Sequence, residues 1–252
     1  MLSSIEQKRV GIFPQYKASK LVMDALLTYA APQLQVQGQE NLNIISQTIQ
    51  QGTPTIFYPN HISNADGPIL AKILESRGIH PVFITGLKLK NNPFTNILTR
   101  ALTTIPIWPP SLRSSKSERE KRRKTNASAF TASIEALTHQ HPLVIFPEAT
   151  RSRTGNLQKG KRQIAERYNH LVEGTQLVPV AIDGSDKMLN VGRILPKRRQ
   201  NVTVSFGKPI DAEVLKKQSE KVSRRWSQPA IDTIMEKIAS MLPPVRRGEY
   251  SS

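Results

Sequence analysis

The residues with the clearest potential for chemistry are His61 and Asp66, five positions apart in the stretch Pro59-Asn60-His61-Ile62-Ser63-Asn64-Ala65-Asp66. A carboxylate that accepts a hydrogen bond from one imidazole nitrogen fixes the tautomer and stabilises the imidazolium, which leaves the other nitrogen to take a proton from a hydroxyl. The pair therefore predicts a general-base dyad. The ordinary alternative is a surface histidine and a helix-capping aspartate, because short motifs often match by chance.

The elements around this pair must bring the two side chains together. Residues 55–58 form a β-branched and aromatic run between two prolines, which predicts a strand that ends just before His61. Apolar residues at helical spacing over 68–75 predict a helix that starts near Asp66. Within one helix the two side chains would point to different faces, at roughly 100° per residue. They can meet only if a loop folds between the strand and the helix.

A second polar stretch, Phe146-Pro147-Glu148-Ala149-Thr150-Arg151-Ser152-Arg153, follows the continuous apolar run at 143–146. Ligands of α/β proteins bind beyond the carboxyl ends of strands, where this stretch and His61 are both expected. Arg151 and Arg153 offer planar donor forks that match phosphate oxygens. Glu148 is either a second acid/base or, more in keeping with its two arginine neighbours, the residue that orients them. The candidate substrate-binding residues here are Glu148, Thr150, Arg151 and Arg153.

The order of elements predicts an α/β fold, with a central, mostly parallel sheet flanked by helices. We expect an N-terminal helical arm over residues 1–33 and one domain over residues 34–252, closed by two C-terminal helices. The expected strands are 34–37, 55–58, 81–85, 105–108, 143–146, 177–182 and 202–206, and the expected helices include 41–50, about 93–103, a long one ending near 137, 211–224 and 228–241.

The N-terminal helix predicted over residues 16–31 carries an apolar stripe. Core packing is the commoner fate of such a stripe, and contact with a bilayer is the alternative for so basic a chain. No window approaches the ~18 apolar residues of a membrane span, so we expect a cytoplasmic or organellar-stroma-like protein that is soluble or peripheral to a membrane. The stripe consists of Leu21, Val22, Ala25, Leu26 and Tyr29.

Composition excludes several kinds of chemistry and points to an anionic partner. The 252 residues include no cysteine, which rules out disulfides, thiolate nucleophiles and Cys-ligated zinc. A net charge of +17 predicts a polyanionic partner, either an anionic membrane surface or nucleic acid. Aromatic residues are few and scattered in apolar runs, so nucleic-acid binding ranks last. The basic stretches are residues 113–124, 193–199 and 216–225.

Two further patterns are weaker than they look. The stretch Gly155-Asn156-Leu157-Gln158-Lys159-Gly160-Lys161-Arg162 nearly spells a P-loop, but Arg162 stands where a Ser or Thr must ligate Mg²⁺. His139 and His141 have no third candidate metal ligand nearby in the sequence. We therefore expect no bound metal and no cofactor.

Taken together, the motifs Asn60-His61 with Asp66, Phe146-Pro147-Glu148-Ala149-Thr150-Arg151-Ser152 and Val178-Pro179-Val180 resemble the glycerolipid acyltransferase family. Its members are the glycerol-3-phosphate and lysophosphatidate acyltransferases with a His-x4-Asp box. The resemblance covers about residues 36 to 210, and three motifs in family order are far more specific than one.

This resemblance implies a role for each residue. His61 would deprotonate the acceptor hydroxyl for attack on an acyl thioester, Asp66 would orient His61, and Arg151 would bind the phosphate of the acceptor. The thioester would be a co-substrate, carried by acyl carrier protein or coenzyme A.

Two departures from the family pattern stand out. Ala149 replaces the usual glycine. The second family box, which normally ends in a basic residue, reads Ile105-Pro106-Ile107-Trp108-Pro109-Pro110. Lys88 and Arg113 are candidates for that basic residue, with plain surface charge as the alternative.

The resemblance points both ways on the acceptor. Residues 121–126 and the Arg-x-Arg spacing look like the soluble plastid-type glycerol-3-phosphate acyltransferases, whereas Phe146-Pro147-Glu148 looks like the lysophosphatidate enzymes. We expect acylation of 1-acylglycerol-3-phosphate in phospholipid biosynthesis, at an anionic membrane surface. The alternatives are glycerol-3-phosphate 1-O-acylation, phospholipid remodelling and, most distantly, nucleic-acid binding.

Overall fold

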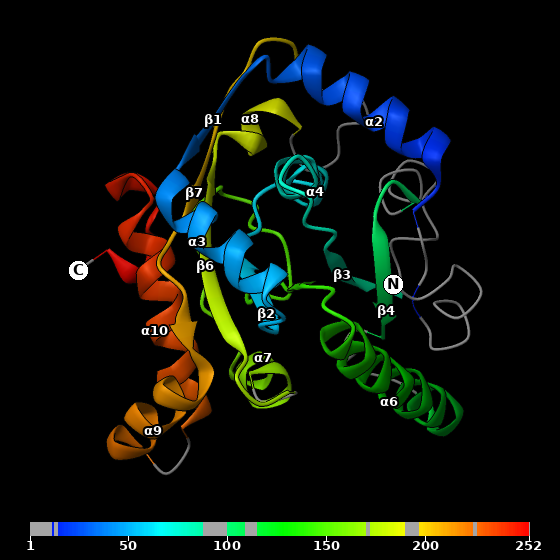
Figure 1. Ribbon diagram of the computed structural model, residues 1–252, viewed down its shortest axis with the longest axis vertical. Coiled ribbons are helices and arrows are strands. Elements are labelled where there is room, and N and C mark those ends of the chain that lie inside the picture. Colours follow the sequence, from blue (N-terminus) through cyan, green and yellow to red (C-terminus); the bar gives the residue numbers. More distant parts are fainter. Residues whose placement is uncertain are drawn as a thin grey trace.

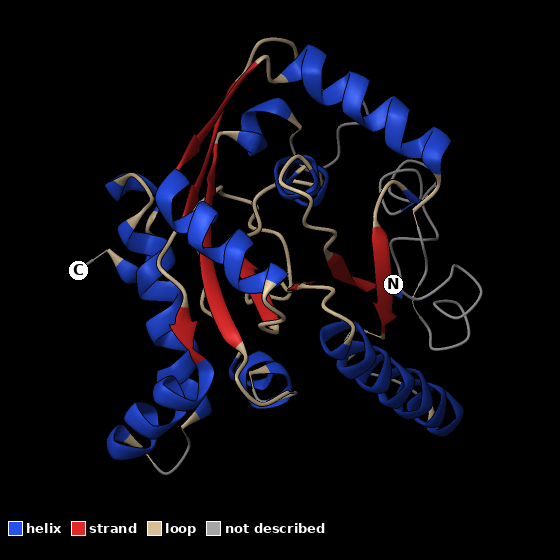
Figure 2. Ribbon diagram, in the orientation of Figure 1, coloured by secondary structure: helices blue, strands red, loops and turns tan. Residues whose placement is uncertain are grey.

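The structure is a computed structural model, which describes residue 12 and residues 15–87, 100–108, 115–169, 172–189, 197–223 and 226–251. Figure 1 shows the elements in chain order, and Figure 2 shows the sheet in red among the helices. The strands are β1 (Gln33–Gln37), β2 (Thr55–Pro59), β3 (Val82–Gly86), β4 (Thr103–Ile107), β5 (Leu143–Val144), β6 (Gln176–Asp183), β7 (Asn201–Phe206) and β8 (Ile210–Asp211). The helices are α2 (Lys17–Ala30), α3 (Gln39–Gln50), α4 (Asp66–Glu75), α6 (Lys116–Thr138), α7 (Arg162–Tyr168), α8 (Ser185–Met188), α9 (Ala212–Val222) and α10 (Ser227–Ser240), followed by the 3-10 turns η2 (Pro244–Arg246) and η3 (Gly248–Tyr250).

The sheet has the order β1-β7-β6-β2-β5-β3-β4, with β8 paired to β6. Neighbours from β6 through β2, β5 and β3 to β4 are parallel, while β7 and β8 run antiparallel to β6. The predicted α/β fold with a mostly parallel sheet is confirmed. Because β2, β5 and β6 are parallel neighbours, their carboxyl ends meet at one edge of the sheet, where α/β proteins bind ligands.

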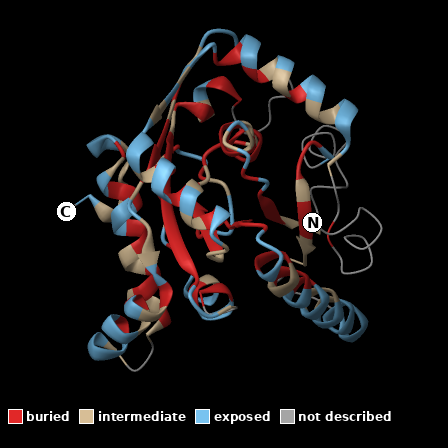
Figure 3. Cartoon of the chain, viewed as in Figure 1, coloured by how far each residue is buried: buried red, intermediate tan, exposed pale blue. Residues whose placement is uncertain are grey.

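Helices cover both faces of the sheet, so the strands are buried on two sides. In β2, Phe57 belongs to the core under α2, α3 and α4. Its neighbours Ile56 and Tyr58 belong to the opposite core under α6, α7, α9 and α10. This alternation explains why β2 and β6 read as continuous apolar runs rather than as alternating ones. Figure 3 shows the red, buried strands between helices whose outer sides are pale blue.

Most predicted elements lie where the sequence placed them, with two differences around the site. The strand expected over 143–146 ends at Val144, because the chain turns there and the Ala149 amide donates to the Phe146 carbonyl. The short helices α7, before β6, and α8, directly after it, were not predicted. The helix expected over about 93–103 falls largely outside the described residues.

Helix α2 packs on the domain through a different side from the one we expected. Met23, Leu27 and Ala30 are buried in the core shared with α4. Leu21 is 71% exposed and Tyr29 is 53% exposed. The interpretation of the predicted stripe as a core face is therefore wrong, because the helix carries a second apolar side that fills that role.

Two polar contacts fasten α2 to α4. The Lys20 ammonium lies 2.9 Å from the Glu75 carboxylate, and Lys72 donates to the Thr28 hydroxyl at 2.8 Å. These contacts hold the outer side of α2 in a fixed orientation away from the core. Throughout the described residues, none of the helices combines the length and apolarity needed to cross a bilayer.

Candidate active site

The loop between β2 and α4 folds so that His61 and Asp66 meet. His61 Nδ1 lies 2.9 Å from Asp66 Oδ2, and the same oxygen accepts from the backbone amides of Ile62 and Ser63, each at 2.8 Å. The Asp66 side chain is fully buried at the first position of α4. The backbone amides hold the carboxylate on the imidazole, as the general-base geometry needs.

The imidazole ring is also fixed in its plane. It stacks on the Phe146 ring, with 4.0 Å between centroids and 24° between planes. Its side chain is 20% exposed, so the ring is reachable from solvent. With Nδ1 on Asp66, the Nε2 atom is the one left to take a proton, and no described residue bonds to it. The ring is therefore oriented for proton transfer at Nε2.

A fourth donor to Asp66 escaped the sequence reasoning. Ser185 donates from its hydroxyl to Asp66 Oδ1 at 2.5 Å, and both residues are fully buried. Ser185 begins α8 directly after β6, following Gly184 at φ +83°. The available signal was a small polar residue in a Gly turn after a third strand of the parallel set. Both carboxylate oxygens thus have protein donors.

Glu148 joins the second loop to the first. Its Oε1 accepts from the His61 backbone amide at 2.7 Å, and its Oε2 accepts from the amide and side chain of Gln158 at 3.2 and 2.8 Å. Burial raises the pKa of the Glu148 carboxyl to about 7, while these donors act to lower it. Among the described residues it makes no ion pair with Arg151 or Arg153, so the expectation that it orients the arginines is wrong.

Arg151 lies within electrostatic range of the dyad. Burial lowers the pKa of its guanidinium, and the negative charge of Asp66 acts in the opposite direction. The next residue, Ser152, donates from its backbone amide to the His61 carbonyl at 2.8 Å. Both backbone groups of His61 are therefore bound by the loop that carries Arg151. This backbone contact places the candidate phosphate-binding residue Arg151 in the loop beside His61.

The structure shows no contact between the other candidate binding residues that it describes and the His61–Asp66 pair. Thr150 and Arg153 are exposed, and the Thr150 carbonyl accepts from the Gln158 side chain at 3.1 Å. Lys88 and Arg113 lie outside the described residues, so the basic residue of the second family box stays a prediction. Part of the 193–199 stretch also lies outside them.

Ala149 has a backbone conformation that suits glycine. Its φ is +58°, in the left-handed region where a Cβ atom crowds the neighbouring carbonyl. The residue is exposed, so its methyl group contributes little packing. The departure from the expected glycine at this position therefore introduces strain of roughly 1–2 kcal/mol into the loop.

The C-terminal turn η2 supports the same loop from outside. Arg246 pairs with Asp183 at 3.3 Å and with Asp186 at 3.0 Å, and its carbonyl accepts from the Leu157 amide at 2.8 Å. Gly155 has φ +80°, and a Cβ built on it would come within 2.0 Å of the Arg246 guanidinium. Glycine suits this position because of its positive φ, and any side chain there would also displace the Arg246 guanidinium.

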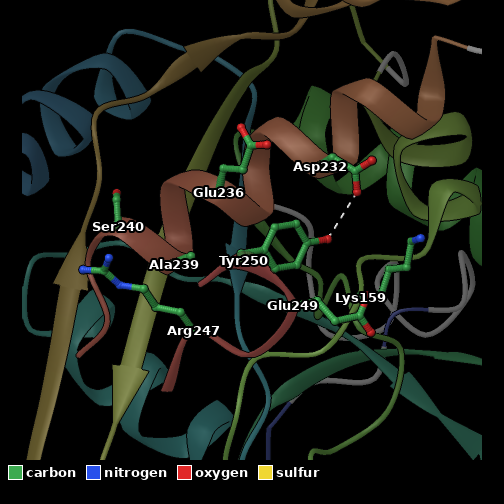
Figure 4. A pocket seen from close by; sticks show the side chains of 8 residues that line it. All are labelled: Lys159, Asp232, Glu236, Ala239, Ser240, Arg247, Glu249 and Tyr250. Carbon is green, nitrogen blue, oxygen red and sulfur yellow. Dashed lines mark hydrogen bonds between the residues drawn. The ribbon is translucent and has the colours of Figure 1, made fainter. Parts of the chain in front are cut away.

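A cavity of ≈ 560 Å³ lies beside this C-terminal segment, away from the dyad. Figure 4 shows Tyr250 reaching across it to Asp232, a contact of 3.2 Å in which the phenol donates. Side chains of both charges line this cavity. Neither His61 nor Asp66 is among them, so the cavity is separate from the candidate site. Its lining residues are Lys159, Asp232, Glu236, Ala239, Ser240, Arg247, Glu249 and Tyr250.

The patterns set aside in the sequence have structural roles here. A Cβ on Gly160 would come within 2.8 Å of Ile231 and Met235, so this glycine allows close packing on α10. His139, directly after α6, contacts the Glu135 carbonyl through Nδ1 at 2.9 Å and caps the end of that helix. In the part of the chain that the structure describes, no cluster of three His, Asp or Glu side chains is arranged to hold a metal ion.

Comparisons with known proteins bear on the family and the fold. Residues 33–183 match the family described as Acyltransferase. The fold is similar to the crystal structure of the 1-acyl-sn-glycerophosphate (LPA) acyltransferase, PlsC, from Thermotoga maritima, with a TM-score of 0.50 and 22% sequence identity. The similarity covers 87% of this chain and 81% of that chain. At this identity the likeness supports the α/β fold.

The strain at Ala149 gives a stability prediction. We expect Ala149→Gly to raise the free energy of unfolding by about 0.5–1 kcal/mol, because glycine relieves the left-handed strain and no packing is lost. Ala127→Gly, at an exposed position inside α6, is the matched control and should lower it by about 0.5–1 kcal/mol. Urea unfolding measures both. Equal destabilisation by the two substitutions would contradict the strain argument.

Ser185 gives a prediction about positioning. We expect Ser185→Ala to lower kcat for acyl transfer by about 10- to 100-fold with little change in KM, because Asp66 loses a donor and the imidazole its exact orientation. Ser185→Thr keeps the hydroxyl and should recover most of the rate. Ser133→Ala is the control, since Ser133 is equally buried but bonds only within α6. A similar loss in the control, or wild-type kcat in Ser185→Ala, would remove Ser185 from the site.

Proposed function

This chain belongs to the Acyltransferase family, and we propose that it transfers a fatty acyl group from an acyl thioester to the free hydroxyl of 1-acylglycerol-3-phosphate. The observation that carries the proposal is the His61–Asp66 dyad, closed at 2.9 Å beside the loop that holds Arg151. A base, His61, and an anion-binding group, Arg151, at one edge of the sheet suit an acceptor that has both a hydroxyl and a phosphate.

The proposed reaction needs only groups that this site and its substrates supply. His61 Nε2 takes the proton of the acceptor hydroxyl as the oxygen attacks the thioester carbonyl carbon. The new C–O bond forms, the C–S bond breaks, and the proton passes from His61 to the leaving thiolate. Asp66 stabilises the imidazolium that exists between the two proton transfers. No cofactor is needed beyond the thioester, carried by coenzyme A or by acyl carrier protein.

Arg151 is the proposed ligand of the acceptor phosphate. A guanidinium stays charged even when partly buried and can bind phosphate oxygens with two parallel donors. The Ser152–His61 backbone bond keeps Arg151 at a fixed place relative to the base. Binding of the phosphate would therefore place the acceptor hydroxyl relative to Nε2.

A lipid acceptor is favoured over free glycerol-3-phosphate by the outer side of α2. Leu21, Val22 and Tyr29 form an exposed apolar surface there. Arg100 lies 5.4 Å from the centroid of the Tyr16 ring, and Arg198 lies 5.2 Å from that of Tyr29. Apolar and aromatic side chains flanked by arginines suit the boundary of an anionic membrane. The solved structure of similar fold is also named for a lysophosphatidate acceptor.

The test of the proposed function is acyl transfer by the purified protein. We expect labelled acyl-coenzyme A to be consumed with 1-acylglycerol-3-phosphate faster than with glycerol-3-phosphate. His61→Ala should lower kcat by about 10²–10⁴-fold while the circular dichroism spectrum stays unchanged, because the base is lost. Near wild-type turnover by His61→Ala would refute the proposal. Transfer to glycerol-3-phosphate alone would identify the other acceptor.

Arg151→Ala separates phosphate binding from chemistry in the same assay. Its KM should rise for 1-acylglycerol-3-phosphate more than its kcat falls, because phosphate is bound in ground and transition states alike. Monoacylglycerol, which lacks the phosphate, serves as the control acceptor. Equal effects on both acceptors would mean that Arg151 does not bind the phosphate.

The outer side of α2 gives a separate prediction about membranes. We expect the wild-type chain to float with anionic vesicles and Leu21→Gln/Val22→Gln to bind them about tenfold less, since two apolar side chains no longer leave water. Val214→Gln/Val222→Gln on α9 is the control. Both valines are exposed, and they lie on a helix other than α2. Unchanged vesicle binding in the α2 variant would exclude this surface as the contact.

A further inference from the structure

We propose that the N-terminal half of α6, residues 116–124, is the docking surface for an acidic carrier protein that brings the acyl thioester. We call these residues the basic half of α6. They hold six Lys/Arg and two Glu, a net charge of +4, and no apolar residue. The inference rests on the proposed acyl transfer and adds the chemical nature of the donor's carrier.

The basic half of α6 extends past the edge of the sheet that carries the dyad. Asn126 bonds both backbone groups of Trp108, accepting at 2.8 Å and donating at 3.2 Å. Trp108 directly follows β4, whose carboxyl end lies at the same edge as that of β2. At a rise of 1.5 Å per residue, the residues of α6 before Asn126 continue for about 15 Å along the helix axis from this contact. Figure 1 shows this end of α6 standing clear of the other described elements.

Local interactions account for the helix without any packing of this half. The buried residues of α6 begin only at Ala129. A capping box between Ser115 and Glu118 starts the helix, and Glu120 contacts Arg123 at 3.3 Å and Lys124 at 3.8 Å. Such caps and pairs stabilise an exposed helix. In Figure 3 this end is almost entirely pale blue.

Most of its positive charge is left for an external partner. Glu118 caps the helix, and Glu120 pairs with two of the six cations. Within the described part of the chain, no carboxylate lies at ion-pair distance from the remaining four. Those four are Lys116, Arg119, Lys121 and Arg122.

The shape and composition of the surface favour a protein over the other polyanions. A convex helix gives a small nucleotide such as coenzyme A no pocket to enter. Without apolar residues, the basic half of α6 gains nothing by insertion into a bilayer. The apolar side of α2, which suits a membrane, lies at the other end of the molecule in Figure 1. Regularly spaced cations on a helix are complementary to an acidic protein surface, and such complementarity speeds association and sets the orientation of the partner.

The test compares one acyl chain on two carriers, a purified acidic acyl carrier protein and coenzyme A. We expect Arg119→Glu/Lys121→Glu to raise KM about tenfold for the protein-carried donor at low salt, through lost electrostatic attraction. KM for the coenzyme A donor should stay within about twofold. Both side chains are exposed and glutamate is a good helix former, so the fold should be kept.

Lys217→Glu/Lys221→Glu on α9 is the matched control, with the same change of charge on another exposed helix. It should leave both KM values unchanged. An unchanged KM for the protein-carried donor in Arg119→Glu/Lys121→Glu would overturn the proposal, as would an equal rise for both donors. Loss of anionic vesicle binding in this variant would assign the surface to a membrane and likewise overturn it.

Direct binding separates failure of this inference from failure of the proposed function. Fluorescence anisotropy of the labelled carrier protein needs no turnover. Salt-sensitive binding that Arg119→Glu/Lys121→Glu abolishes would support docking even if no acceptor is acylated. Binding that is equal in wild type and variant would refute docking even if acyl transfer is found.

Discussion

The site depends on the burial of one negative charge. A carboxylate taken fully out of water is tolerated only if donors replace its hydration. Asp66 has four of them, from His61, Ile62, Ser63 and Ser185. Meeting this demand fixes the loop after β2, the start of α4 and the turn after β6. The orientation of the His61 imidazole therefore follows from the need of the buried Asp66 carboxylate for donors in place of water.

A second set of contacts makes the two loops one unit. The amide and carbonyl of His61 are both used, by Glu148 and Ser152. The position of the imidazole relative to Arg151 is therefore set through the backbone, which is stiffer than a contact between two long side chains. The loop also contains the strained turn at Ala149, and near its other end Arg246 accepts from the Leu157 amide and pairs with Asp186. Strain of this kind persists where the surroundings determine the conformation.

The sequence predicted the fold and the dyad because both rest on local patterns. Apolar runs show buried parallel strands, and the strand, loop and helix around His61 lie within about twenty residues. Ser185 and the true partners of Glu148 could not be found in this way, since they depend on which strands become neighbours. The outer side of α2 was misread because two apolar sides share one helix, and periodicity alone does not say which side meets the core.

The position of β2 in the centre of the sheet has a kinetic consequence. Its neighbours β5 and β6 come from far along the chain, and the contact between Ser185 and Asp66 spans 119 residues. Parallel pairing over such distances is slow, because loop-closure entropy is lost before the contacts form. The geometry of the candidate site should thus be among the last features acquired during folding. Until β6 joins β2, water rather than the Ser185 hydroxyl donates to Oδ1 of Asp66, so the candidate site is completed only together with the central sheet.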